Sequence, residues 1–150
     1  MNVYIATKFE AVEGFSKAKT LLEAAGHRIT HDWTTDNVAG LQGEELKAYL
    51  TQCAATCVIG IYMSDVLIFL PTKEHMAGSF IELGLAIGMW KRVIIVDAFN
   101  PEFQQPIFYN LPEVQDIYHH VKTIEEAVAL VKPIEAKVKD VVQAPVSGSN

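Results

Sequence analysis

Short, strongly apolar runs alternate along this chain with longer segments in which apolar residues recur every three or four positions. The apolar runs are residues 3–6, 65–70 and 92–96, and weaker strand-like segments cover 27–30 and 117–121. Helical spacing is found in residues 9–25, 44–57 or 44–59, 79–90 and a last segment that starts at Thr123. Strands that alternate with helices of this length predict an α/β fold with a parallel sheet.

The expected architecture is a single doubly wound, flavodoxin-like domain. Right-handed crossovers would give about five parallel strands in the order 2-1-3-4-5, with helices on both faces of the sheet. A chain of 150 residues is the size of one ordinary domain. We expect this domain to span residues 1–143 and to be followed by a flexible C-terminal tail, 144–150, of small and polar residues.

Charge and composition narrow the range of partners. The net charge of −6 argues against a nucleic-acid polymer, because proteins that bind one need a basic face. No apolar run is long enough to span a bilayer, and the first residues lack the charged and apolar regions of a signal peptide. We therefore expect no membrane partner and a cytoplasmic location.

Several common motifs are missing from the sequence. No phosphate-binding loop and no dinucleotide fingerprint follows the first strand, and there is no nucleophile elbow of a serine hydrolase. Cys53 and Cys57 lie one helical turn apart, which is typical of two reduced thiols on one helix face. No further Cys or His stands near them at a usual ligand spacing, so the sequence predicts no metal and no other cofactor.

The segment Gly78 to Ala86 carries the strongest functional indication. It follows the apolar run 65–70 and a polar loop, so we expect a helix to begin at Ser79, with Glu82 in its first turn. That position is the carboxyl edge of the sheet, where open α/β folds bind ligands. Two interpretations stay open: Glu82 acts on a substrate, or Ser79 and Glu82 form a capping box that ties down the helix end.

Polar and aromatic residues gather at the same predicted edge. The loops after the first three strands supply the candidate substrate-binding residues Thr7, Lys8, Phe9, Asp32, Trp33, Gly78 and Ser79. A cationic neighbour would keep Glu82 ionised, and Ser79 with the free N–H groups of its helix could hold an anionic or hydroxyl group. A solvated charge for Lys8 and a peripheral core position for Trp33 remain open alternatives, and Tyr4 is expected in the core.

The chain resembles the nucleoside 2-deoxyribosyltransferase family and the related nucleotide N-glycosidases. The resemblance covers roughly residues 1–131 and rests on the order and spacing of several short pieces. These pieces are residues 4–6, 25–30, 64–68, 78–86, 91–96, 110–112 and 125–127. Each piece alone is weakly specific, and the set together is fairly specific.

The resemblance implies a function and a set of roles. Glu82 would be the nucleophile that attacks the anomeric carbon of a deoxyribose, and the glycosyl-enzyme intermediate would pass to another base or to water. Trp33 would stack on the base, and Gly78 and Ser79 would lie where a 5′-phosphate is held. The partner would be a small-molecule nucleoside or nucleotide, and no cofactor would be needed. Relatives are homodimers or higher homo-oligomers, so the loop with Tyr109 and Asn110 would complete a partner's site.

Two positions depart from the family pattern. Cys57 and Met76 stand where aspartates are expected, so the proton for the leaving base would come from Asp32, Asp36, His75 or Asp97. The alternative is a catalytically inactive nucleotide-binding module of the same fold. A receiver-type regulator fits less well, because no acidic cluster follows the first strand.

Overall fold

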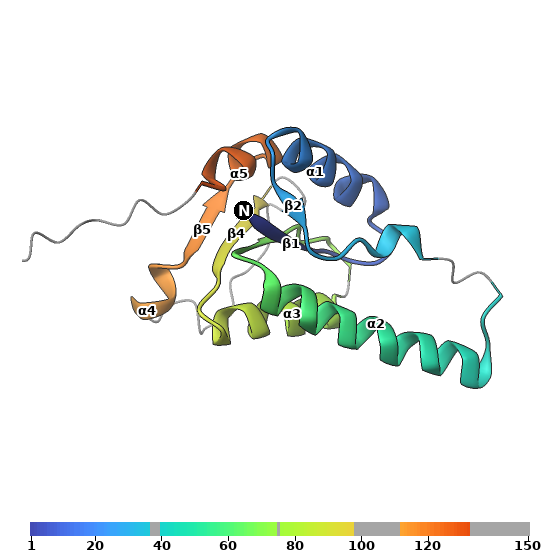
Figure 1. Cartoon of the computed structure of the whole chain (residues 1–150). Coiled ribbons are helices and arrows are strands. Elements are labelled where there is room, and N and C mark those ends of the chain that lie inside the picture. Colours follow the sequence, from blue (N-terminus) through green and yellow to red (C-terminus); the bar gives the residue numbers. More distant parts are fainter. Residues whose placement is uncertain (37–39, 75, 98–111, 133–150) are drawn as a thin grey trace, which may run out of the picture.

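Five parallel strands form one sheet in the order β2-β1-β3-β4-β5 in the described part of the chain. The computed structural model describes residues 1–36, 40–74, 76–97 and 112–132 (Figure 1). The strand order and the parallel pairing confirm the predicted flavodoxin-like α/β fold. The predicted domain boundary at residue 143 and the tail that follows it lie outside the described residues.

The elements follow the predicted alternation closely. The strands are β1 Asn2–Ala6, β2 Arg28–Ile29, β3 Val66–Phe69, β4 Arg92–Val96 and β5 Tyr118–Val121. The helices are α1 Val12–Ala24, α2 Gly43–Met63, α3 Ala77–Gly88, α4 Pro112–Gln115 and α5 Ile124–Leu130, and a 3-10 turn, η1, covers Trp33–Thr35.

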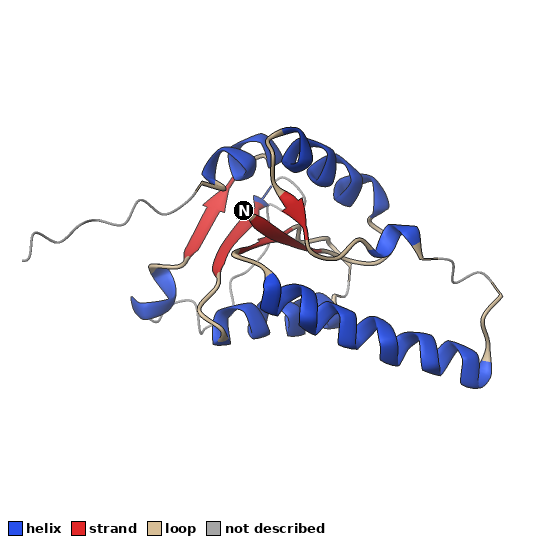
Figure 2. Ribbon diagram, viewed as in Figure 1, coloured by secondary structure: helices blue, strands red, loops and turns tan. Residues whose placement is uncertain are grey.

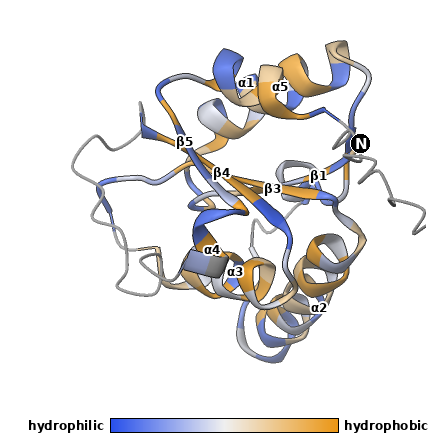
Figure 3. Ribbon diagram, turned by 90° about the vertical axis from the view of Figure 1, so that its left-hand side faces the viewer, coloured by the Kyte–Doolittle hydropathy of each residue, from blue (hydrophilic) through white to orange (hydrophobic). Residues whose placement is uncertain are grey.

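Two helical layers cover the sheet, with α1 and α5 on one face and α2 and α3 on the other (Figure 2). Because side chains alternate along a strand, Val3 and Ile5 of β1 pack toward α1 and α5, whereas Tyr4 and Ala6 pack toward α2 and α3. The apolar strand β3 lies between both layers and is fully buried (Figure 3). A continuous apolar strand is what a sheet covered on both faces requires.

Three helix boundaries differ from those expected. Helix α1 begins at Val12 instead of Phe9, and α2 continues to Met63, beyond the predicted end at residue 57 or 59. Between Val58 and Met63 there is no proline, and the single glycine, Gly60, fits the helix packing. The apolar run therefore continues the helix. Helix α3 begins at Ala77, two residues before the expected start. Residues 112–115, which follow the undescribed segment 98–111, form the short helix α4.

Within the described segments, no helix combines the length and the apolar character that crossing a bilayer would require.

Candidate functional site

A cavity of about 250 Å³ opens at the carboxyl edge of the sheet, beside the ends of β1 and β3 and the start of α3. It is lined by Thr7, Lys8, Phe9, Glu10, Trp33, Cys53, Cys57, Met76, Ala77, Gly78, Ser79 and Glu82. These residues come from the loops after β1 and β2 and from helices α2 and α3. The structure thus gathers Glu82 and six of the eight predicted binding residues around one cavity.

Glu82 is held by a hydrogen bond across the helix–sheet interface. The Tyr4 hydroxyl donates to Glu82 Oε1 at 2.7 Å, and Tyr4 itself is 1% exposed. Burial raises the pKa of Glu82 above its usual value, and the hydrogen bonds from Tyr4 and Cys57 lower that pKa in part. Burial and the neighbouring carboxylate raise the pKa of Tyr4, so its hydroxyl stays a proton donor.

The capping-box interpretation of Ser79 and Glu82 is wrong. Helix α3 is capped at Met76, which makes no side-chain capping bond, and Ser79 therefore lies inside the first turn. Glu82 is too far along the helix to reach the cap, and its carboxylate bonds to Tyr4 instead. The side chain is thus available at the wall of the cavity.

Cys57 is a third member of this polar group. Its thiol forms hydrogen bonds with both Tyr4 and Glu82, and burial raises its pKa to about 12. A cation was expected beside Glu82, and Lys8 does line the cavity. Lys8 pairs instead with Glu74 and, at 3.6 Å, with Glu10. Tyr4 and Cys57 take the place of a cation as the hydrogen-bond donors to Glu82.

The loop after β1 forms one wall of the cavity, as predicted. Thr7 is buried, and its hydroxyl donates to the carbonyl of Leu70 at 3.0 Å, which ties this loop to the end of β3. Phe9 packs on Trp33 with ring centroids 4.8 Å apart. Trp33 also packs on Phe15 and is 7% exposed, so this residue is both a core aromatic and part of the cavity wall.

Asp32 does not line the cavity, although its position after the second strand predicted a place among the binding residues. Its carboxylate caps η1 by accepting the N–H of Thr34 at 3.0 Å, and it pairs with Lys19 at 2.5 Å. Burial alone would raise the pKa of Asp32, but the hydrogen bonds from Lys19 and Thr34 hold it below its usual value. This makes Asp32 a poor proton donor.

The other suggested proton donors are also engaged or undescribed. Asp97 pairs with His120 at 2.7 Å, and Asp36 accepts the hydroxyl of Tyr49 at 3.0 Å. His75, Tyr109 and Asn110 lie outside the described residues, so the predicted contribution of Asn110 stays a prediction.

Gly78 and Ser79 occupy the first turn of α3, whose N–H groups lack partners within the helix. A methyl group added at Gly78 would meet no atom within 4 Å, so the backbone is open toward the cavity at this point. The arrangement suits an anionic or hydroxyl group of a ligand.

Sequence reasoning missed Tyr4 as a functional residue. Its apolar neighbours in β1 favoured a core position, and the side chain is indeed buried. The signal that could have found it is strand register. Tyr4 pairs with Leu67 of β3, and both side chains face α2 and α3, the layer that carries Glu82.

A larger cavity, of about 530 Å³, lies at the amino edge of the sheet. Its lining includes Asp65, Trp90, Arg92 and His119. Asp65 accepts the backbone N–H of Asn2 at 2.7 Å, as expected for a residue at the start of a strand. Because ligands bind parallel α/β sheets at the carboxyl edge, the smaller cavity around Glu82 is the stronger candidate.

The fold and this cavity define a flavodoxin-like α/β domain with a half-buried carboxylate at the carboxyl edge of its sheet. The solved structures that are similar to it include two enzymes, each at 16% sequence identity. The CMP N-glycosidase BcmB from Clostridium botulinum matches with a TM-score of 0.55 over 86% of this chain and 96% of that one. A 2-deoxyribosyltransferase from Bacillus psychrosaccharolyticus matches with a TM-score of 0.64 over 85% of this chain and 90% of that one.

Both are enzymes of the kind that the sequence resembles, and at this identity the likeness establishes the shared fold. No family model and no curated protein sequence matches the chain.

Proposed function

We propose that this protein is an enzyme that cleaves the N-glycosidic bond of a nucleoside or 2-deoxynucleoside, or of the 5′-monophosphate of either. The observation that carries the proposal is the Glu82 carboxylate, which lines the cavity at the carboxyl edge and accepts a hydrogen bond from Tyr4. The activities named for the two similar structures support the same class of reaction.

The proposed reaction proceeds through a glycosyl-enzyme intermediate. An oxygen of Glu82 attacks the anomeric carbon as the bond from that carbon to the base nitrogen breaks, and the bonding electron pair leaves with the base. The transition state resembles an oxocarbenium ion, which a nearby carboxylate stabilises and then traps. Water or a second base attacks the same carbon in the next step and restores the free carboxylate. The reaction requires no cofactor.

The other cavity residues suit the binding of such a substrate. Trp33 and Phe9 form an aromatic wall for a base, and the first turn of α3 at Gly78 and Ser79 suits a 5′-phosphate. Partial burial of Glu82 strengthens its electrostatic effect on a developing positive charge, since water screens it less than at an open surface.

A second function is favoured by one observation. Cys57 and Met76 both line the cavity, at the positions where the resemblance leads us to expect aspartates. The alternative is therefore a nucleotide-binding module that has kept the cavity and lost the chemistry.

One experiment separates the two functions. The protein is incubated with a panel of nucleosides, 2′-deoxynucleosides and their 5′-monophosphates, with and without an acceptor base, and released base is quantified. We expect release by the wild type and a loss of at least about a thousandfold in Glu82→Ala. Glu44→Gln, an exposed glutamate on α2, is the control and should retain the rate. Equal rates in wild type and Glu82→Ala would refute the nucleophile. Nucleotide binding without release from any substrate would establish the binding module.

We also propose that the protein assembles as a homodimer or higher homo-oligomer. Helix α2 exposes several large apolar side chains, which supports burial of this face against a second copy. The cytoplasmic location stays a prediction.

A further inference from the structure

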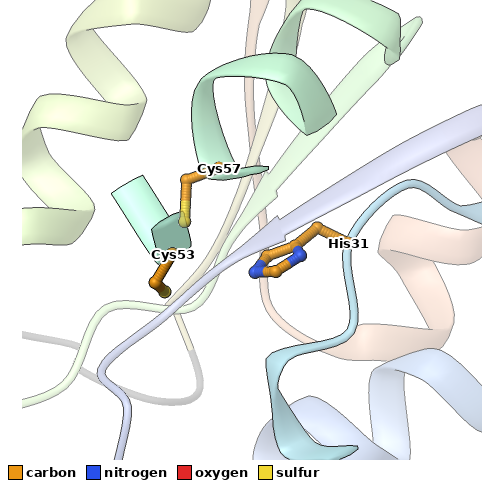
Figure 4. A group of neighbouring side chains, drawn as sticks. All are labelled: His31, Cys53 and Cys57. Atoms are coloured by element: carbon orange, nitrogen blue, oxygen red, sulfur yellow. The ribbon is translucent and has the colours of Figure 1, made fainter. Parts of the chain in front are cut away.

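The fold places His31 beside Cys53 and Cys57, the two cysteines of α2. One donor atom each from His31, Cys53 and Cys57 lies within 4.8 Å of the others, and all three residues are half-buried (Figure 4). The imidazole of His31 extends from the loop after β2 toward the thiols on the helix (Figure 4). Sequence spacing does not predict this cluster, because more than 20 residues separate His31 from Cys53.

Local structure fixes both sides of the cluster. The N–H of Thr30 donates to the carbonyl of Val3 at 3.0 Å, which anchors the chain beside β1 immediately before His31. The cysteines are four residues apart on α2, the spacing that puts two side chains on one face of a helix. Gly60 lets the helix approach, because a methyl group there would lie 3.1 Å from His31 Cβ.

One ring nitrogen of His31 is available to coordinate a metal ion. Its Nε2 is buried and has no hydrogen-bond partner among the described residues. A buried polar atom without a partner carries a free-energy penalty, so native proteins seldom leave one unsatisfied. The ring stacks on Tyr4 with centroids 6.4 Å apart and an interplanar angle of 13°, which holds its orientation.

We propose that His31, Cys53 and Cys57 form a zinc site at the edge of the Glu82 cavity. Two thiolates and one imidazole are a donor set that zinc prefers, and three protein ligands leave a fourth tetrahedral position open. Zinc bond lengths place two coordinating sulfurs about 3.8 Å apart. The three donor atoms already lie within 4.8 Å of one another, so only small side-chain movements are needed for them to coordinate the ion.

The open fourth coordination position of the zinc ion lies beside the cavity that contains Glu82. Both thiols line the same cavity as Glu82, so water, or a nitrogen or oxygen atom of a bound small molecule, can complete the coordination. Zinc binding releases both thiol protons to solvent, and Cys57 then no longer donates a hydrogen bond to Glu82.

Metal binding is tested on the full chain in the presence of a non-thiol reductant. The protein is freed of metal with a chelator and titrated with Zn²⁺ against a chromophoric competitor, and Co²⁺ serves as a spectroscopic probe for thiolate ligands. We expect one zinc per chain with a dissociation constant below about 1 μM and a thiolate-to-cobalt charge-transfer band. Stoichiometric zinc should protect both cysteines from alkylation, a readout that requires no variant.

The variants Cys53→Ser and His31→Gln identify the ligands. Removal of an outer-sphere partner already costs about 10- to 100-fold in metal affinity, so each substitution should weaken zinc binding at least as much. His119→Gln, on β5 far from the cluster, is the matched control and should bind as the wild type does. Circular dichroism of the metal-free proteins shows that each variant is folded.

Absence of zinc binding, or equal affinity in wild type, Cys53→Ser and His31→Gln, would overturn the site. The inference does not rest on the proposed reaction, since binding is measured without substrate. Glu82→Gln should still bind zinc while losing base release, so failure of one proposal is distinguishable from failure of the other.

Discussion

The surroundings of Glu82 act on the pKa of its carboxyl group in two opposing ways. The side chain leaves α3 beside the buried cluster that includes Tyr4, Phe69 and Leu83, and burial raises its pKa. The Tyr4 hydroxyl and the Cys57 thiol offset part of that cost by donating hydrogen bonds. In the proposed reaction the carboxylate must be ionised, and these two donors favour its ionised form.

Tyr4→Phe tests this dependence. Without the phenol, the pKa of Glu82 should rise further, because a hydrogen bond that lowers it is gone. The nucleophile must be ionised. As the pH is lowered, base release by Tyr4→Phe should therefore decline at a higher pH than base release by the wild type. At neutral pH we expect a rate about 10- to 100-fold lower, the usual effect of losing a hydrogen bond to a charged group. The pH–rate profile of metal-free protein measures both effects, and an unmoved acidic limb would contradict them.

Gly78→Ala tests the cavity wall at the start of α3. The added methyl group meets no atom of the folded chain within 4 Å, so stability should stay the same or rise by up to about 1 kcal/mol. The methyl group would, however, occupy the space proposed for a 5′-phosphate. We therefore expect a higher Michaelis constant for nucleotides in the base-release assay.

Gly84→Ala is the matched control for this change. Gly84 lies on the same helix, its added methyl group is equally unobstructed, and it does not line the cavity. It should raise the midpoint of thermal unfolding and leave nucleotide binding as it is. A similar rise in the Michaelis constant in both variants would argue against phosphate binding at Gly78.

At the scale of elements, Gly60 determines how closely α2 packs on β1. A methyl group there would lie 3.1 Å from ring atoms of Tyr4 and from His31 Cβ. This contact is tighter than ordinary packing allows, and both neighbours are held by other interactions.

Gly60→Ala should therefore destabilise the protein, because overpacking outweighs the better helix propensity of alanine. We expect a net loss of about 1 to 2 kcal/mol in the free energy of unfolding, measured by urea denaturation. An unchanged or higher stability would mean that α2 does not approach β1 this closely.

The elements were predictable where one strong pattern determines them. The runs 65–70 and 92–96 are continuously apolar, which predicts central parallel strands, and the chain order then predicts the topology. Glu82 could be placed at the carboxyl edge for the same reason. Helix ends were less predictable, since α3 begins at Ala77 and its N-cap residue, Met76, makes no side-chain capping bond that would mark the start.

Contacts between distant segments could not be read from the sequence. The bond from Tyr4 to Glu82 spans 78 residues, and the meeting of His31 with Cys53 and Cys57 depends on how α2 lies on the sheet. Asp32 was misplaced for a local reason: the 3-10 turn that follows it takes its carboxylate as a cap.

At the scale of the whole molecule, helices cover both faces of the sheet (Figure 2), yet helix α2 keeps large apolar side chains exposed. Large apolar side chains on α2 remain more than a third exposed: Leu46, Leu50, Val58, Ile59, Tyr62 and Met63. An apolar surface along one helix is typical of an interface between protein chains.

We expect sedimentation velocity to show a dimer or higher oligomer. Ile59→Lys, at a residue 60% exposed, should shift the protein toward the monomer without unfolding it, because the charge would be buried in the interface. Thr20→Lys on the exposed side of α1 is the control and should leave the assembly unchanged. A wild type that sediments as a monomer at all concentrations would contradict the proposed assembly.

The central claim is that Glu82 forms a covalent bond to the sugar. A 2′-fluorinated deoxynucleoside tests it most directly, because the electron-withdrawing fluorine destabilises the oxocarbenium-like transition state and slows breakdown of the intermediate. Mass spectrometry of the digested protein should then show a fluorosugar adduct on the peptide that contains Glu82, and no adduct in Glu82→Gln. Base release at the wild-type rate by Glu82→Gln, or an adduct on a different residue, would contradict the account.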